Sequence, residues 1–167
     1  MVTLRKICKG EQIPIAVVLA YVPAFSNPPW KECHNGGDVL VKLGDSANWK
    51  FLYVFYEGDE IIGGAVFLPL ERSSIFEIFL PRTPERAWLE EFFIHPKFHG
   101  RGLGKEAFSL LLQEIRANGF RGIASRTHAN HPAMISIFES HGFTKIGENS
   151  AETGGQKHPR AYFLQQA

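Results

Sequence analysis

Excess charge of either sign is nearly absent from this chain. Its 167 residues include 18 lysines and arginines and 17 aspartates and glutamates, so the formal net charge is +1. Proteins that bind nucleic acid or an anionic membrane through their bulk charge carry a strong positive excess. We therefore expect neither partner, and any anionic ligand must be held by a local arrangement of donors.

Cysteine and long apolar runs are also scarce. Only Cys8 and Cys33 are present, and their spacing does not make a disulfide framework, so we expect a reducing compartment, the cytoplasm. The run IPIAVVLAYV follows three basic residues, as in a signal peptide. It is far shorter than the roughly 20 apolar residues of a membrane span, and no A-x-A cleavage site follows it. We expect neither secretion nor membrane insertion.

We also expect that the chain has no metal site. His95 and His99 are four residues apart, as are metal ligands on some helices, but Pro96 and Gly100 prevent these two from sharing a helix face. No cysteine or acid completes a tetrahedral set beside them or beside His128 and its neighbour at position 131.

The apolar pattern indicates one globular domain over residues 1–167, with alternating strands and helices. The chain is 44% hydrophobic, enough for one buried core. The predicted elements are a strand at 2–8, a helix at 12–25, a hairpin at 51–70, a strand at 87–96, a helix at 104–118, a strand at 121–128, a helix at 132–141 and strands at 143–147 and 161–165. This order predicts a mixed α/β layer structure.

Two stretches are less clearly patterned. Residues 26–48 are rich in proline, glycine, asparagine and aspartate, and we expect a connection with a short helical or extended piece at 39–43. Residues 71–86 predict a second long connection with a short strand at 75–79. Within the hairpin, Gly63-Gly64 indicates a β-bulge or a close backbone approach.

The stretch FHGRGLGKEA, residues 98–107, has glycines at three alternate positions before a helix. It is not a Walker A loop, because His99 stands at the first glycine position and Glu106 at the serine or threonine position. It is not a dinucleotide fingerprint, because Lys105 or Ala107 stands at the third glycine position. The glycines can simply make a tight turn. The alternative, favoured by the neighbouring cations, is a cradle of backbone N–H groups that binds a diphosphate at a helix N-terminus.

The segment LEEFFIHPKFHGRGLGKEAFSLLLQEI, followed by NHPAMISIFESHGFTKIGE, resembles the GNAT-type N-acetyltransferase superfamily. The family motif R/Q-x-x-G-x-G/A reads HGRGLG here, with both glycines matched and His99 in place of arginine or glutamine. The close resemblance covers residues 88–148. It implies a mixed, mostly antiparallel central sheet of about six to seven strands, flanked by about four helices, in which the fourth and fifth strands splay apart.

The resemblance also implies acetyl-CoA as the cofactor. Backbone N–H groups from residues 99–105 would hold its diphosphate, and the strand before the loop would offer backbone groups to the pantetheine arm. The implied cofactor-binding residues are Ile94, His99, Gly100, Arg101, Gly102, Leu103, Gly104, Lys105 and Asn130.

Acetyl transfer to an amine needs a group that removes a proton from the ammonium. Glu90 and Glu91 lie in an otherwise apolar strand, and adjacent strand residues face opposite sides of a sheet, so one should face the site. The sequence LEEFF resembles the polyamine acetyltransferases, whose first acid is regarded as the base, and this favours Glu90. A bulge would favour Glu91 instead, and both could be surface charges at a sheet edge.

The residue that would protonate the departing thiolate differs from the family pattern. Many members have tyrosine four residues before the glycine that ends the last helix, but Phe138 stands there and cannot donate a proton. Water, Ser136, His141 or Tyr162 could replace it.

From the family resemblance we predict an N-acetyltransferase for a primary amine, either a small molecule, a polyamine-like amine or a peptide amine, with direct attack in a ternary complex. The alternative is a catalytically weak or inactive acyl-CoA-binding domain, and a homodimer is left open.

Overall fold

The computed structural model describes residues 1–73, 83–153 and 156–166, so the strand predicted at 75–79 lies outside the described residues. In this part of the chain, seven strands form a mixed sheet and four α-helices accompany it. The strand order is β1-β2-β3-β4-β5-β7-β6, and the sheet is not closed. The predicted fold class is therefore confirmed. None of the helices in the described ranges is long and apolar enough to cross a membrane.

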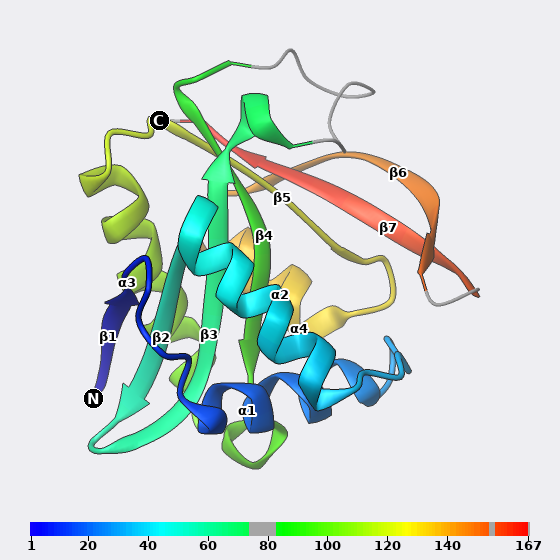
Figure 1. Ribbon diagram of the computed structural model, residues 1–167. Coiled ribbons are helices and arrows are strands. Elements are labelled where there is room, and N and C mark those ends of the chain that lie inside the picture. The colour runs from blue at the N-terminus through cyan, green and yellow to red at the C-terminus, as the bar shows by residue number, and fades with distance from the viewer. Residues whose placement is uncertain (74–82, 154–155, 167) are drawn as a thin grey trace. The chain divides into compact units, whose positions relative to one another are not determined.

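The elements have the following bounds in chain order (Figure 1). They are β1 (Val2–Ile7), α1 (Ile15–Ser26), α2 (Gly36–Trp49), β2 (Phe51–Glu57), β3 (Glu60–Pro69), the 3-10 helix η1 (Leu70–Arg72), β4 (Arg86–Ile94), the 3-10 helix η2 (Pro96–Phe98), α3 (Leu103–Ala117), β5 (Gly122–His128), α4 (Pro132–Ser140), β6 (Thr144–Thr153) and β7 (Gln156–Gln165).

The chain divides into two compact units. Unit 1 comprises residues 1–67 and 91–111, and unit 2 comprises residues 68–90 and 112–167. The chain passes from one unit to the other within β3, within β4 and within α3. The prediction of a single domain over the whole length remains a prediction.

In unit 1, β1 pairs with β2 and β2 pairs with β3, both antiparallel (Figure 1). The register of β2 and β3 shifts between Phe55, which pairs with Gly63, and Tyr56, which pairs with Ile61. A Cβ atom on Gly63 would lie 2.1 Å from the carbonyl oxygen of Phe93, so β4 approaches β3 too closely for any side chain there. Both the bulge and the close approach that Gly63-Gly64 indicated are confirmed.

Helix α2 is the largest difference from the sequence prediction, which placed only a short piece at 39–43. The Asn35 side chain accepts a hydrogen bond from the Gly37 N–H at 2.7 Å and caps the helix. Val39 and Leu43 then fall on one buried face. The prediction missed this helix because its three glycines have low helix propensity, whereas packing of the apolar face provides most of a helix's stability.

The core of unit 1 lies between these two helices and the strands. Tyr21 and Phe25 of α1, Leu43 of α2 and Phe93 of β4 belong to one cluster of buried side chains. The rings of Tyr21 and Phe93 meet edge to face, with centroids 5.0 Å apart. Burial of side chains of this size contributes roughly 1.5–3 kcal/mol each, so the packing holds α1 against the C-terminal half of β4.

In unit 2, β4 and β5 are parallel neighbours. Their register runs from Arg86 with Gly122 to Leu89 with Ser125, in the first half of each strand, whereas β4 continues to Ile94 and β5 to His128. This pairing of the first halves is typical of strands that splay toward their C-terminal ends.

The antiparallel strands β6 and β7 of unit 2 extend well beyond the predicted 143–147 and 161–165 (Figure 1). Sequences such as ENSAET lack the alternation of apolar and polar residues that predicts a half-buried strand, because the half-buried positions of β6 here carry small or polar side chains. Pairing between the two strands supplies the backbone hydrogen bonds instead.

Candidate functional site

The glycine loop in unit 1 connects β4 to α3 through η2. The His95 Nδ1 atom accepts a hydrogen bond from the Lys97 N–H at 3.0 Å and caps η2, whose first residue is Pro96. Gly100 and Gly102 follow with φ angles of +76° and +78°. A Cβ at either position would meet no atom within 4 Å, so the left-handed backbone, not crowding, requires glycine here.

The loop leaves a set of backbone N–H groups at the N-terminus of α3. The Gly102 carbonyl accepts the N–H of Glu106 at 3.2 Å, which begins the helical pattern. The N–H groups of Leu103, Gly104 and Lys105 precede this bond, and no acceptor for them is found among residues 1–73, 83–153 and 156–166. Alternation of left-handed and right-handed residues makes a concave anion-binding turn. The residues present therefore fit a diphosphate.

Two cations at the loop, Arg101 and Lys97, already have carboxylate partners. Arg101 forms an ion pair with Glu57 at 2.9 Å, and Lys97 forms one with Glu60. The two glutamates face each other across the β2–β3 hairpin, next to its turn. The structure thus neutralises the Arg101 side chain that the sequence predicted as a phosphate contact, and an anionic ligand has to compete with Glu57 for it.

His99 binds the backbone of its own loop. Its Nε2 atom lies 3.0 Å from the Ile94 carbonyl oxygen, and because a carbonyl can only accept, Nε2–H is the donor. The N–H of His95 donates to the Ile62 carbonyl of β3 at 2.8 Å. Since neighbouring residues of a strand direct their N–H groups to opposite sides, the Ile94 N–H points away from β3. The His99 side chain therefore stabilises the turn between β4 and α3.

Glu91 lies in a cluster of three polar side chains, which we call the Glu91 cluster: Tyr21, Lys42 and Glu91. The Tyr21 hydroxyl donates to Glu91 Oε1 at 3.2 Å and accepts from Lys42 Nζ at 2.9 Å, and Lys42 also contacts Glu91 Oε1. The Glu91 side chain is 12% exposed and that of Lys42 44%. Carboxylate, phenol and ammonium therefore share one half-open site next to the Phe93 ring.

The surroundings of Lys42 and Tyr21 in this cluster keep both groups protonated. Burial lowers the pKa of the Lys42 ammonium, but the Glu91 carboxylate and the Tyr21 hydroxyl raise it by more, so the net shift is upward. Burial, together with the Glu91 charge, raises the pKa of the Tyr21 hydroxyl. At neutral pH Lys42 is a cation and Tyr21 a neutral donor.

The sequence favoured Glu90 over Glu91. Glu91 lies on the side of β4 that faces Tyr21, and Glu90, half-buried, lies on the opposite side of the strand. Tyr21 and Lys42 were not predicted as site residues. Tyr21 lies in an apolar helix and Lys42 in the poorly patterned segment, so only the tertiary fold reveals them.

A second polar pair lies beside Tyr21, and the sequence gave no signal for it. The His34 Nε2 atom is 2.8 Å from Glu32 Oε2, and the His34 ring meets the Tyr21 ring edge-on at 5.3 Å. The N–H of Glu32 donates to the Phe25 carbonyl at 2.9 Å, which anchors the α1–α2 connection. Carboxylate–imidazole pairs of this kind orient the imidazole and can serve proton transfer.

Two further predicted positions lie in unit 2. The N–H of Asn130 donates to His128 Nδ1 at 3.1 Å, in the turn before α4. Phe138 is 1% exposed, and its ring packs 4.8 Å from that of Phe163. The aromatic side chain at position 138 therefore has a core role, in keeping with its lack of a donor.

Metal ligands do not cluster in the described ranges, where no group of three or more histidine, cysteine, aspartate or glutamate side chains could hold an ion. One ring nitrogen each of His95 and His99 is bonded to the loop backbone. Cys8 and Cys33 are both free and exposed.

Comparison with solved structures finds the same fold in several acetyltransferases. A proposed phosphinothricin N-acetyltransferase has a TM-score of 0.76 at 18% identity, covering 99% of this chain and 98% of the other. YncA from Salmonella typhimurium, solved with its cofactor acetyl-CoA, has a TM-score of 0.73 at 19% identity and coverages of 99% and 94%. The ribosomal-protein-alanine N-acetyltransferase from Brucella melitensis has a TM-score of 0.74 at 15% identity and coverages of 99% and 99%.

A search of curated protein sequences finds no match to this chain. The family model of the acetyltransferase (GNAT) family matches residues 20–143, which is most of the chain and includes the glycine loop and the Glu91 cluster. The chain belongs to the acetyltransferase (GNAT) family.

Proposed function

We propose that this protein is an acetyl-CoA-dependent N-acetyltransferase that acts on a primary amine. The observation that carries the proposal is the set of N–H groups at residues 103–105, which the left-handed Gly102 turns toward one point at the N-terminus of α3. A helix N-terminus with exposed N–H groups favours a phosphate-bearing ligand. Because the chain belongs to the acetyltransferase family, we infer that this phosphate-bearing ligand is acetyl-CoA.

Cofactor binding would rest mainly on backbone groups. The N–H groups of residues 103–105 would donate to the diphosphate, whereas the His99 N–H already donates to the Pro96 carbonyl at 3.0 Å. The Ile94 N–H, which points away from β3, would donate to an amide carbonyl of the pantetheine arm. Asn130, which lies in unit 2, stays a prediction of the family resemblance. Acetyl-CoA supplies an activated thioester carbonyl, and the chain's task is to hold that carbonyl and the amine in contact.

Proton removal from the amine is assigned to the carboxylates of β4. Glu90 and Glu91 are the candidates, and Glu91 has the geometry for an amine. Its donors among the described residues, Tyr21 and Lys42, both reach Oε1, so Oε2 can accept from a bound ammonium. A carboxylate held in this way orients the amine and receives its proton directly or through water.

Release of coenzyme A has no dedicated donor at position 138, because phenylalanine has no proton to donate and Phe138 packs in the core of unit 2. We infer that the thiolate leaves and is protonated by solvent or by another side chain. The same observation favours one other function, an acyl-CoA-binding domain with weak or no turnover. We further propose that the protein acts in the cytoplasm, where two exposed free cysteines remain reduced.

Two measurements test this proposal and separate it from the alternative. Calorimetric titration with acetyl-CoA should show binding, and a thiol-release assay should show turnover with an amine from a panel of amino acids, polyamines, aminoglycosides and peptides. Binding without thiol release for any acceptor would favour the acyl-CoA-binding domain. Absence of binding at millimolar acetyl-CoA would contradict both functions.

A further inference from the structure

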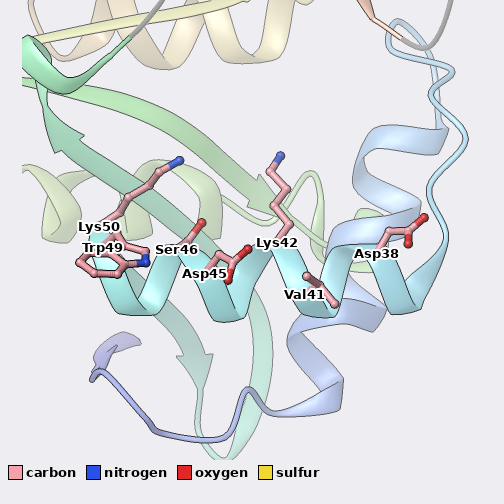
Figure 2. Close-up of a pocket in the computed structure, with 7 residues that line it drawn as sticks. All are labelled: Asp38, Val41, Lys42, Asp45, Ser46, Trp49 and Lys50. Carbon is pink, nitrogen blue, oxygen red and sulfur yellow. The ribbon is translucent and has the colours of Figure 1, made fainter.

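A pocket of about 510 Å³ lies along one side of α2 and adjoins the Glu91 cluster through Lys42. Its lining residues are Asp38, Val41, Lys42, Asp45, Ser46, Trp49 and Lys50. Figure 2 shows the side chains of Lys42, Ser46 and Lys50 extending from the same side of the helix. They are spaced at i, i+4 and i+8, which places them in one row on a helix surface.

Lys42 has a hydrogen-bond donor left for a ligand. An ammonium group has three N–H bonds. One reaches Glu91 Oε1 and another reaches the Tyr21 hydroxyl, and the side chain is 44% exposed. The third N–H can therefore serve the pocket while the first two fix the position of the nitrogen.

The described part of the pocket and the adjoining Glu91 carry charges of both signs. Lys42 and Lys50 supply positive charges, and Asp38, Asp45 and Glu91, which is paired with Lys42, supply negative charges. A polycation would bring several ammonium groups against the two lysines, and a polyanion would meet both aspartates. A ligand with one charge of each sign finds a partner of opposite charge for each of its groups.

We propose that the acceptor is a zwitterion, an amine that also carries a carboxylate, and that Lys42 and Lys50 hold its carboxylate across Ser46. This inference rests on the proposed acetyl transfer and names its substrate class, an amino acid or an amino acid derivative with a free carboxylate. The ammonium end would lie at Glu91 Oε2, one hydrogen bond beyond Lys42. Lys42 then has two tasks, because it orients Glu91 and selects the acceptor.

The chemical step balances with these groups. The bound ammonium gives one proton to the carboxylate of Glu91, directly or through water, and the neutral nitrogen attacks the thioester carbonyl. The C–N bond forms and the C–S bond breaks. The second nitrogen proton leaves with the collapse of the intermediate, and one proton goes to the coenzyme A thiolate while the other reaches solvent. The acceptor carboxylate takes no part in bond changes and serves only recognition.

A matched panel of acceptors tests the inference. The probes are the twenty amino acids, each paired with its carboxamide, which keeps the amine and removes the negative charge. We expect kcat/KM for the preferred amino acid to exceed that for its carboxamide by about tenfold or more. Equal rates for the two members of every pair, or a preference for the carboxamides or for spermidine, would overturn the inference.

Substitutions test whether the lysines of the α2 row bind the acceptor carboxylate. Lys50→Gln should lower the preference for the carboxylate several-fold, chiefly through KM of the amino acid, and should leave acetyl-CoA binding unchanged. The control is Lys145→Gln, which removes an exposed lysine of unit 2 that pairs with Glu148, and it should keep the wild-type preference. Unchanged selectivity in Lys50→Gln would contradict the assignment of the carboxylate to this row.

Failure of the inference is distinguishable from failure of the proposed function. If acetyl-CoA binds and thiol release occurs only with amines that lack a carboxylate, the inference of a zwitterionic acceptor is wrong, but the proposed acetyltransferase function is supported. If no amino acid of the panel releases thiol, the zwitterion is likewise wrong. If acetyl-CoA itself does not bind, the proposed function is wrong.

Discussion

The glycine loop and the Glu91 cluster, both in unit 1, are built in contrasting ways. The loop directs backbone N–H groups of residues 103–105 outward and relies on two glycines for its shape. The cluster gathers three side chains from α1, α2 and β4, which are far apart in the sequence. A backbone site depends on the φ angles of a few consecutive residues, whereas a side-chain site depends on how helices pack on strands. The two should respond differently to substitution.

The largest effect is expected at the backbone site. Gly102→Val places a β-branched residue at a φ of +78°, a conformation that costs of order 1–3 kcal/mol and would turn the N–H groups of the loop away from their common point. We expect acetyl-CoA affinity to fall by about 30-fold or more, measured by calorimetric titration.

The matched control is Gly44→Val in α2, where a Cβ meets no atom within 4 Å and the backbone is helical. This variant should bind acetyl-CoA like the wild type. Equal losses of affinity in both variants would show that the loss reflects general destabilisation.

The side-chain site should respond in stability as well as in activity. Lys42→Met leaves the Glu91 carboxylate, which is 12% exposed, without its cation. Uncompensated charge in a half-buried site costs about 1–3 kcal/mol, and we expect a lower free energy of unfolding in urea. Glu91→Gln added to Lys42→Met should restore part of that loss. Additive losses in the double variant would contradict the coupling between the two side chains.

A smaller change in acetyl-CoA affinity is expected from the ion pair between the loop and the β2–β3 hairpin. Glu57→Gln releases Arg101 from its ion pair, so the guanidinium no longer has to exchange a carboxylate for a phosphate. Because exposed ion pairs contribute roughly 0–1 kcal/mol, we expect acetyl-CoA affinity to rise about threefold at low salt, and the gain to shrink as salt increases. Glu148→Gln, in an exposed ion pair of unit 2, should leave affinity unchanged. Weaker binding by Glu57→Gln would mean that the hairpin pair positions the loop.

The smallest effect concerns pH. Burial and the charges of Lys97 and His99 lower the pKa of His95, although Glu60 opposes them. The unfolded chain therefore binds this proton at a higher pH than the folded chain, and the His95 contribution to stability is lost as the pH falls through the lowered value. Asparagine can accept the Lys97 N–H without titrating, so His95→Asn should lose less melting temperature than the wild type between pH 7 and pH 5. An equal fall would show that His95 is not involved.

The sequence predicted most of what backbone geometry controls. The hairpin, α3, the glycine loop and the bulge at Gly63-Gly64 follow from turn residues and apolar periodicity, and the fold class follows from their order together with the family resemblance. Helix α2 was missed because its glycines weaken the helical signal, and the long β6–β7 ribbon because its polar residues do not alternate.

The side-chain sites were less accessible from the sequence. Glu91 was predicted as a candidate but ranked second, because its partners, Tyr21 and Lys42, lie 70 and 49 residues away and meet it only in the fold. His99 was predicted as a cofactor-binding residue, and the structure gives its ring a backbone partner, the Ile94 carbonyl. The exchange of His99 for glutamine, which can also donate to a carbonyl, should therefore preserve the loop.

The most direct test of the central claim is an NMR titration of the ¹⁵N-labelled protein with coenzyme A. We predict that the largest amide shifts occur at residues 102–105, the N-terminus of α3, with smaller shifts at Ile94 at the end of β4. Shifts confined to other regions, or none at millimolar coenzyme A, would contradict the assignment of this loop as the diphosphate site.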